Sequence, residues 1–259
     1  ERTFEVLFEP TPRTALQNWS ATRNAIVLDV LDNVRSRVWV VTPTDNTWRR
    51  QEVALPSLGA ASVRPVDRYE SDQVFITYQD FLTPPTLFLG AARQPVEKLK
   101  SMPAFFDASR MTVQQLEAKS RDGTSVPYFV VGSSGVKNAP TMLYGYGGFE
   151  NALEPFYSGT LGRAWLARGG VLVVANIRGG GEFGPAWHQA ALKDKRQNAF
   201  DDFIAIAEDL ARRGIAQPRQ IGIRGGSNGG LLVGAALTQR PELFGGAVAQ
   251  VPLLDMKRY

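Results

Sequence analysis

The stretch IGIRGGSNGGLLVGAAL, residues 221–237, decides the fold class. It carries the pattern G-x-S-x-G at Gly225, Ser227 and Gly229, after a short apolar run typical of a strand and at the start of a run typical of a helix. On so sharp a turn the serine backbone is strained, and the two glycines remove Cβ atoms that would collide with strand and helix. The stretch predicts a nucleophilic Ser227 above the carboxyl edge of a sheet, rather than an incidental serine in a glycine-rich helix start.

A nucleophile of this kind needs hydrogen-bond donors for the negative charge that develops on the attacked oxygen. The backbone N–H of Asn228 lies at the predicted helix start, where the helix dipole also favours negative charge. The string YGYGGF, residues 144–149, follows another predicted strand and stands where a hydrolase would donate a second group. Its tyrosines offer a phenolic donor, although the string also fits a turn that only packs its aromatic rings.

The composition excludes several classes of function. The chain has 259 residues, of which 44% are hydrophobic and 21% are charged, as in a soluble globular protein with one large domain or two smaller ones. The net charge is +4 and the basic residues are scattered, so we expect no nucleic-acid partner. There is no cysteine and His188 is the single histidine, which excludes thiol catalysis and Cys-based zinc sites. We expect no metal and no cofactor.

The sequence shows no membrane segment. No apolar stretch reaches about 18 residues, and the N-terminus has no basic segment followed by an apolar one. We therefore expect a cytoplasmic protein without a membrane partner. A signal peptide already removed would leave a periplasmic or secreted location open.

The first part of the chain, residues 1–100, consists of short β segments arranged as hairpins. Sliding one hairpin onto the next places Ile26 over Val74 and Val41 over Leu89, a spacing of 48 residues. This spacing is in the range of propeller-blade repeats, although a plain antiparallel meander also fits. We expect the C-terminal blades of an incomplete propeller here.

The second part, residues 101–259, alternates strand-like runs with helical patterns, which predicts an α/β sheet. The clearest helix spans about 199–213, with Asn198 as its cap, two aspartates at its positive end and Gly214 as its stop. The strand-like runs look buried and parallel, and they comprise residues 128–131, 141–144, 171–177 and 221–223. A further apolar run covers residues 247–251.

A dinucleotide site is the main competing motif. Gly179, Gly181 and Gly184 formally satisfy G-x-G-x-x-G after a predicted strand. Such a site needs a helix that starts within the glycines and an acidic residue at the end of the next strand. Pro185 interrupts the pattern and no such acid follows. We therefore do not expect dinucleotide binding.

The chain offers no good general base for Ser227. His188 lies 39 residues before Ser227, whereas the histidine of an α/β-hydrolase follows its nucleophile. We expect His188 to pack or hydrogen-bond locally beside Trp187. Asp255 could be a triad acid after the 247–251 strand, but a turn residue is the favoured interpretation.

Five strings stand in order and at consistent spacing, and through them residues 140–259 resemble the prolyl oligopeptidase family of serine peptidases. The strings are YGYGGF (144–149), ANIRGGGEFG (175–184), WH (187–188), FDDF (200–203) and GGSNGG (225–230). Asn228 and YGYGGF look closer to the proline-cleaving branch than to the oligopeptidase B and acylaminoacyl peptidase branches. The resemblance implies part of an α/β-hydrolase domain preceded by the last blades of a β-propeller, matched by pattern more than by motif.

The resemblance also implies roles for single residues. Ser227 looks like the nucleophile, and the backbone N–H of Asn228 and the hydroxyl of Tyr146 look like the oxyanion hole. Phe149 resembles an aromatic wall of the substrate pocket, and Leu253 aligns with an apolar residue of a proline-binding pocket. Such a pocket suits a proline ring, which has no N–H to satisfy and a fixed φ. The implied activity is hydrolysis of short peptides after proline.

In the family the acid and histidine lie downstream of the position of Tyr259, so the resemblance implies further sequence at both ends. The missing groups could also come from a second polypeptide that carries the rest of the hydrolase domain; otherwise we expect a monomer. A polypeptide ending at Tyr259 should be inert, because an unassisted serine hydroxyl is a weak nucleophile. The alternatives are an oligopeptidase with basic or acylaminoacyl preference, and an inactive fragment that only binds peptide.

Overall fold

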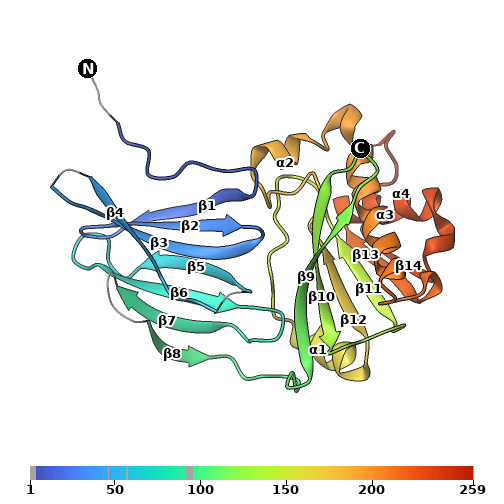
Figure 1. Ribbon diagram of the computed structural model, residues 1–259, viewed down its shortest axis with the longest axis horizontal. Coiled ribbons are helices and arrows are strands. Elements are labelled where there is room, and N and C mark those ends of the chain that lie inside the picture. The colour runs from blue at the N-terminus through green and yellow to red at the C-terminus, as the bar shows by residue number, and fades with distance from the viewer. Residues whose placement is uncertain (1–3, 46, 57, 92–95, 259) are drawn as a thin grey trace. The chain divides into compact units, whose positions relative to one another are not determined.

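A computed structural model describes residues 4–45, 47–56, 58–91 and 96–258 of the chain. The chain forms two compact units, of which the first comprises Glu1–Ala104 with Glu154–Tyr157 and the second Phe105–Leu153 with Ser158–Tyr259. In Figure 1 the strands of the first unit run from blue to blue-green, and the second unit runs from green to red.

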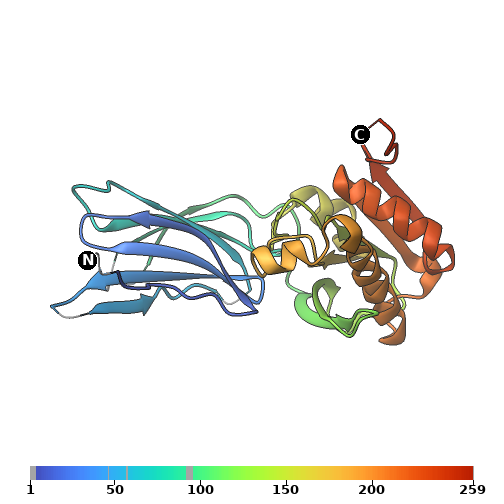
Figure 2. The same cartoon turned by 90° about the horizontal axis from the view of Figure 1, so that it is seen from above.

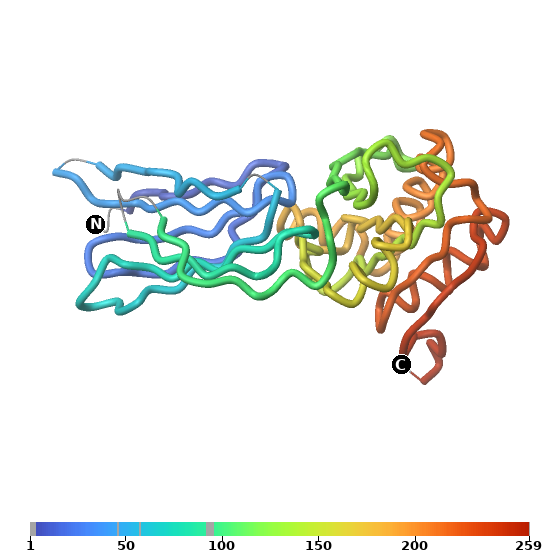
Figure 3. Tube along the Cα trace, turned by 90° about the horizontal axis from the view of Figure 1, so that it is seen from below, coloured from blue at the N-terminus to red at the C-terminus, as the bar shows by residue number. Residues whose placement is uncertain are grey.

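The first unit consists of two four-stranded antiparallel sheets, each with its strands in chain order. One sheet contains β1 (Thr14–Ala21), β2 (Ile26–Asp32), β3 (Arg35–Pro43) and β4 (Trp48–Glu52). The other contains β5 (Ala60–Pro65), β6 (Gln73–Gln79), β7 (Thr86–Ala91) and β8 (Glu97–Ser101). Figure 3 shows these meanders as successive hairpins. Four-stranded meanders are the arrangement of propeller blades, so the fold predicted for this part is confirmed.

The predicted overlay of the two hairpins is off by one residue. Ile26 pairs with Val41, whereas Val74, the counterpart of Ile26, pairs with Gly90. Val41 therefore corresponds to Gly90 and not to Leu89. The cause is the connection, because a tight turn joins β2 to β3 and a longer loop joins β6 to β7.

The core of the first unit draws side chains from both sheets. A buried cluster includes Val27, Val38, Val63, Ile76 and Tyr78. The sequence did not predict β1, β4, β5 and β8, because these strands expose many polar side chains and lack a continuous apolar run.

The segment Glu154–Tyr157 brings a carboxyl group into the first unit. Ser36 Oγ donates a hydrogen bond to Glu154 Oε2 at 3.3 Å. Burial raises the pKa of Glu154, and burial together with the Glu154 charge raises the pKa of Asp29 to about 7. In the folded first unit the pKa of each carboxyl group therefore lies above its ordinary value.

The second unit is built on a six-stranded mixed sheet in the order β14-β13-β11-β12-β10-β9. Its strands are β9 (Met111–Lys119), β10 (Ser125–Ser133), β11 (Thr141–Gly145), β12 (Val171–Ala175), β13 (Ile221–Gly226) and β14 (Gly246–Gln250). The four strands from β14 to β12 are parallel, so their carboxyl ends meet at one edge. The predicted α/β sheet is confirmed.

One strand of this sheet differs from the prediction. Residues 128–131 lie in β10, which is antiparallel to both β12 and β9, not parallel. A short turn at 120–124 folds β9 back onto β10, and a hairpin necessarily joins antiparallel strands. The sequence did not predict β9, because most of its side chains are polar and partly exposed.

Within the described residues, four α-helices accompany the sheet: α1 (Gly159–Ala164), α2 (Pro185–Gln189), α3 (Gln197–Arg212) and α4 (Asn228–Gln239). Short 3₁₀ turns occur at Leu166–Arg168, Lys193–Lys195, Pro218–Gln220 and Pro241–Leu243. Helix α3 packs along β9 and β10, α4 packs along β13 and β14, and the two helices contact each other, as Figure 2 shows. Their apolar faces and the sheet form one core that includes Leu143, Phe203, Leu210, Ile223 and Leu232.

Helix α3 begins earlier than predicted. Asn198 is not its cap but lies in its first turn, where Asn198 Nδ2 donates to the carbonyl oxygen of Ala190 at 2.8 Å. Arg196 already has helical dihedral angles because the 3₁₀ turn Lys193–Lys195 leads straight into the helix. Gly214 follows the helix with φ of 69°, as a left-handed stop.

None of the described helices combines the length and the apolar character that a membrane crossing needs.

Candidate active site

Ser227 occupies a strained turn between β13 and α4. Its φ is 55° and its ψ is −117°, a conformation that a residue with a side chain rarely adopts. The backbone N–H of Ser227 donates to the carbonyl oxygen of Gln250 at 2.9 Å, which fixes the turn to the end of β14. The structure thus has the strand, the sharp turn and the helix that the sequence predicts around Ser227.

The two glycines of the G-x-S-x-G pattern are needed for close backbone packing. A Cβ added to Gly225 would lie 2.1 Å from the carbonyl oxygen of Gly229 in the first turn of α4. A Cβ added to Gly229 would lie 2.6 Å from the carbonyl oxygen of Gly145 at the end of β11. Both distances are well below van der Waals contact, so any larger residue would push Ser227 out of position.

We expect Gly225→Ala to lower the free energy of unfolding by about 1–3 kcal/mol, because its methyl group overlaps backbone that cannot move aside. Gly222→Ala on the same strand is the matched control, since its Cβ has no neighbour closer than 3.8 Å and its cost should stay within about 0.5 kcal/mol. Urea unfolding of both variants measures the difference. Equal midpoints would show that the turn of residues 225–229 between β13 and α4, the elbow, does not require glycine.

The YGYGGF loop after β11 lies against the start of α4. Asn228 Nδ2 donates to the carbonyl oxygen of Tyr146 at 2.6 Å, and a Cβ at Gly148 would lie 2.4 Å from that same nitrogen. The Tyr146 ring is half-buried, with its Cδ2 3.5 Å from the Cβ position of Gly229. The fold therefore brings Tyr146 of the YGYGGF loop close to Ser227 and Asn228 at the start of α4. These are three of the five residues for which the sequence predicts a role.

The other two predicted site residues, Phe149 and Leu253, lie on the YGYGGF loop and on the segment after β14. Phe149 ends the YGYGGF loop with φ of 54° and has an exposed fraction of 65%. Leu253 is half-buried in the segment after β14, and the adjoining Pro252 packs against Gly230 of α4. Their roles as walls of a substrate pocket stay a prediction.

The glycine-rich loop after β12 is held by a buried ion-pair cluster that the sequence did not predict. Arg178 Nε donates to Asp202 Oδ2 at 2.9 Å, and the backbone N–H of Arg178 donates to the same oxygen at 3.0 Å. Asp122 also pairs with the guanidinium, and Ser120 Oγ donates to Asp202 Oδ1 at 2.6 Å. These partners raise the pKa of Arg178 against the opposing effect of its burial. Asp202 is therefore a structural partner of the loop and not a helix-dipole residue.

The glycines of this loop serve packing between loops. A Cβ at Gly179 would lie 2.4 Å from the carbonyl oxygen of Gly147, and one at Gly181 would lie 2.1 Å from that of Glu150. Of the three glycines in the G-x-G-x-x-G pattern, Gly184 is the residue directly before helix α2. Pro185 does not break the chain, however, but begins α2, because proline suits the first helical position.

His188 belongs to the same loop packing. Its Nδ1 lies 2.7 Å from the carbonyl oxygen of Gly179 and 3.0 Å from the backbone nitrogen of Glu150. The adjacent Trp187 donates from Nε1 to the carbonyl oxygen of Ile177 at 3.0 Å. These contacts are the local hydrogen bonding expected for this histidine.

Asp255 lies in a turn near the end of the described chain. Its Oδ1 accepts a hydrogen bond from the backbone N–H of Lys257 at 3.2 Å, and its Oδ2 lies 3.4 Å from Arg258 Nε. The carboxylate is exposed, in agreement with the favoured turn interpretation.

Within the described residues no group of three or more acidic, histidine or cysteine side chains is arranged to hold a metal ion.

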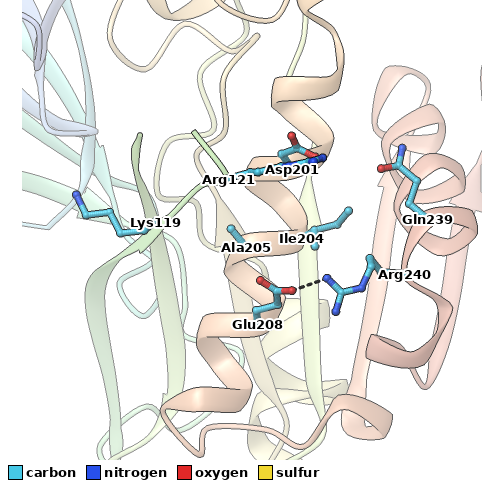
Figure 4. Close-up of a pocket in the computed structure, with 8 residues that line it drawn as sticks. All are labelled: Lys119, Arg121, Asp201, Ile204, Ala205, Glu208, Gln239 and Arg240. Atoms are coloured by element: carbon cyan, nitrogen blue, oxygen red, sulfur yellow. Dashed lines mark hydrogen bonds and ion pairs between the residues drawn. The ribbon is translucent and has the colours of Figure 1, made fainter. Parts of the chain in front are cut away.

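A cleft of about 550 Å³ lies elsewhere on the second unit, between α3, the end of β9 and the end of α4. Figure 4 shows Glu208 of α3 and Arg240 facing each other across it as an ion pair. The lining residues are Lys119, Arg121, Asp201, Ile204, Ala205, Glu208, Gln239 and Arg240. None of them is a predicted site residue, so this charged cleft is separate from the elbow.

Blade-like sheets followed by a mixed sheet with a nucleophile elbow define an α/β-hydrolase with propeller blades before it. Comparison with known families assigns both parts. Residues 1–99 match the prolyl oligopeptidase N-terminal beta-propeller domain, and residues 159–259 match the prolyl oligopeptidase family. The chain belongs to the prolyl oligopeptidase family of serine peptidases.

Individual relatives agree with this assignment. An uncharacterized peptidase of Sinorhizobium fredii is 46% identical over 258 residues, which cover 98% of this chain and 35% of the relative. A post-proline cleaving enzyme from Rickettsia typhi has a TM-score of 0.90 and 39% identity, over 98% of this chain and 37% of that one. Oligopeptidase B from Trypanosoma brucei has a TM-score of 0.85 and 30% identity, over 95% of this chain and 36% of that one. The chain therefore spans about a third of the length of these relatives.

Proposed function

We propose that the complete protein containing this chain hydrolyses short peptides on the carboxyl side of proline, through an acyl-enzyme on Ser227. The observation that carries the proposal is the meeting of two motifs at one place. The strained turn at Ser227 lies against the YGYGGF loop, and Asn228 Nδ2 joins the two by its hydrogen bond to the carbonyl oxygen of Tyr146.

In the proposed reaction Ser227 Oγ attacks the scissile carbonyl carbon and gives its proton to a general base. The new C–O bond places the carbonyl electron pair on an oxyanion, which accepts hydrogen bonds from the backbone N–H of Asn228 and the Tyr146 hydroxyl. Asn228 is the first residue of α4, so its N–H has no acceptor in a preceding helical turn. As the intermediate collapses, the base gives this proton to the leaving amine, and water, which loses a proton to the same base, then attacks the acyl group and releases it as a carboxylic acid.

The proposed base is a histidine outside these 259 residues, as the family resemblance implies. His188 is a poor candidate because its Nδ1 is already engaged with the carbonyl oxygen of Gly179 and the backbone nitrogen of Glu150. A site that has a serine nucleophile and oxyanion donors but no general base cannot hydrolyse peptides at a useful rate. The activity is therefore proposed for the complete protein and not for an isolated piece.

Proline preference is the finer part of the proposal. It is supported by the apolar residues Phe149 and Leu253, whose chain neighbours Gly148 and Pro252 lie against Asn228 and Gly230 of α4. It is also supported by the higher identity to the post-proline cleaving enzyme than to oligopeptidase B. A proline ring fits an apolar, aromatic-lined pocket because it carries no N–H to satisfy. Basic or acylaminoacyl preference on the same scaffold is the alternative.

The preference is tested with a panel of blocked dipeptide anilides, Gly-Pro, Gly-Ala, Gly-Arg and Gly-Lys, which differ only in the residue before the cut. We expect the kcat/KM of the complete protein for the proline substrate to exceed the others by about 10-fold to 200-fold, the range that apolar pocket contacts supply. Faster hydrolysis of the arginine or lysine substrate would contradict the proposal. Ser227→Ala protein provides the blank for background hydrolysis.

A further inference from the structure

We propose that Arg196 is a positioning residue, which clamps the YGYGGF loop to the elbow and places a half-buried positive charge behind the oxyanion site. Arg196 immediately precedes α3 and is half-buried. Its guanidinium donates from Nη1 to the carbonyl oxygen of Gly147 and from Nη2 to Asn228 Oδ1, the latter at 3.0 Å. This inference rests on the proposed function, since it assigns Arg196 a role in the reaction at Ser227.

The two acceptors lie on different segments of the chain. Gly147 belongs to the loop that carries Tyr146, and Asn228 is the residue after the proposed nucleophile. Because Asn228 Oδ1 accepts from Arg196, its Nδ2 is directed to the carbonyl oxygen of Tyr146, where the hydrogen bond is 2.6 Å long. One guanidinium therefore fixes, directly and through one amide, the positions of both proposed oxyanion donors.

The surroundings of Arg196 differ from those of a structural arginine. Within the described residues no carboxylate lies at ion-pair distance from it, whereas Arg178 has both Asp202 and Asp122. The Arg196 guanidinium instead lies 5.4 Å from the centre of the Phe200 ring. Burial accordingly lowers the pKa of Arg196, while its electrostatic interaction with Tyr146 opposes this effect.

A half-buried cation without a carboxylate partner is less favourable for the folded state than a paired one, because it loses part of its hydration without an opposite charge in return. Its position is explained if a negative charge forms nearby only during the reaction, because such a charge is stabilised most by a preorganised, partly desolvated cation. The hydrogen bonds of Arg196 to the carbonyl oxygen of Gly147, the residue after Tyr146, and to Asn228 Oδ1 place its charge close to both proposed oxyanion donors. Arg196 should therefore lower the energy of the transition state much more than that of bound substrate.

The test uses Arg196→Met and Arg196→Lys in the complete protein, with Lys195→Met as a matched control. Lys195 is the adjacent cation and is exposed, so its loss should change no kinetic constant more than about twofold. For Arg196→Met we expect kcat for the Gly-Pro anilide to fall roughly 30-fold to 100-fold, somewhat less than for removal of a direct oxyanion donor. KM should stay within about threefold, because substrate binding does not use the clamp.

The second readout is inhibition by a peptide aldehyde that ends in prolinal. Ser227 Oγ adds to the aldehyde carbon, and the hemiacetal oxygen then occupies the proposed oxyanion site, which mimics the transition state. Arg196→Met should weaken this inhibitor by about the same factor as kcat. A role confined to fold stability would lower the melting temperature and leave the inhibition constant of the folded enzyme unchanged, which would overturn the inference.

Arg196→Lys keeps the test decisive if the methionine variant does not fold. Lysine retains the charge but lacks the planar fork that spans Gly147 and Asn228, so we expect an intermediate loss of kcat, about 3-fold to 10-fold, with KM unchanged. Unchanged kcat in both variants, or in Arg196→Lys alone if the other cannot be purified, would overturn the inference. Ser227→Ala separates the two proposals, because full activity in that variant would refute the proposed function irrespective of Arg196.

Discussion

Ser227→Ala is expected to reduce the turnover of a Gly-Pro anilide by the complete protein by roughly a factor of 10⁶, by analogy with removal of the nucleophile from a serine peptidase. The strained φ of 55° holds the side chain of Ser227 out of the regular structure, and no neighbouring hydroxyl stands at the same turn. Alanine removes the attacking oxygen and leaves only substrate binding and the oxyanion donors.

Ser134→Ala is the matched control for this loss. Ser134 is an exposed serine in the glycine-containing turn after β10, and its replacement should leave turnover unchanged. The steady-state rates of both variants, with circular dichroism to confirm folding, provide the measurement. Wild-type turnover in Ser227→Ala would assign the activity to a different nucleophile.

The largest expected effect on stability comes from Asp202→Ala, which should lower the free energy of unfolding by about 3–5 kcal/mol. Asp202 is fully buried, and both of its carboxylate oxygens accept hydrogen bonds from Arg178. Its loss leaves Arg178, a residue with an exposed fraction of 4%, with the partly exposed Asp122 as its remaining carboxylate partner among the described residues. Urea unfolding of the complete protein measures the change.

Asp201→Asn, one position earlier on α3, is the control and should change the unfolding free energy by no more than about 0.5 kcal/mol. A double replacement, Arg178→Met with Asp202→Leu, should cost much less than the sum of the single replacements, because no buried charge is then left unpaired. Additive costs would mean that the two side chains do not act as a pair.

The ion-pair cluster of Arg178, Asp202 and Asp122 also predicts that the second unit loses stability in acid. The hydrogen bond from Arg178 lowers the pKa of Asp122 to about 2, whereas the unfolded chain takes up this proton near pH 4. The stabilising contribution of Asp122 is therefore complete above about pH 4 and is lost as the pH falls toward 2. The glycine-rich loop after β12 should be among the parts of the second unit that acid loosens first.

The elbow could be predicted from sequence because its requirements are local. A strand, a sharp turn and a helix follow each other within residues 221–237, and glycine is needed at fixed positions around Ser227. The blade hairpins could be recognised for the same reason, although their register could not. Register depends on the length of each connection, and the β6–β7 loop differs from the β2–β3 turn.

The supporting residues could not be predicted because their partners lie far away along the chain. Asp202 stands in the first turns of α3, where a helix-dipole role is the natural interpretation, but its partner Arg178 is 24 positions earlier. Arg196 contacts Gly147 and Asn228, which are 49 and 32 positions away. Only the folded sheet, which brings β11, β12 and β13 side by side, places these groups together.

Covalent labelling can show whether Ser227 is the nucleophile of a serine peptidase. The complete protein is treated with a fluorophosphonate, and the modified residue is identified by mass spectrometry of the digested protein. We expect one adduct per chain, on the peptide that contains Ser227, and loss of anilide hydrolysis in proportion to labelling. An adduct on another serine, or full loss of activity with Ser227 unmodified, would contradict it.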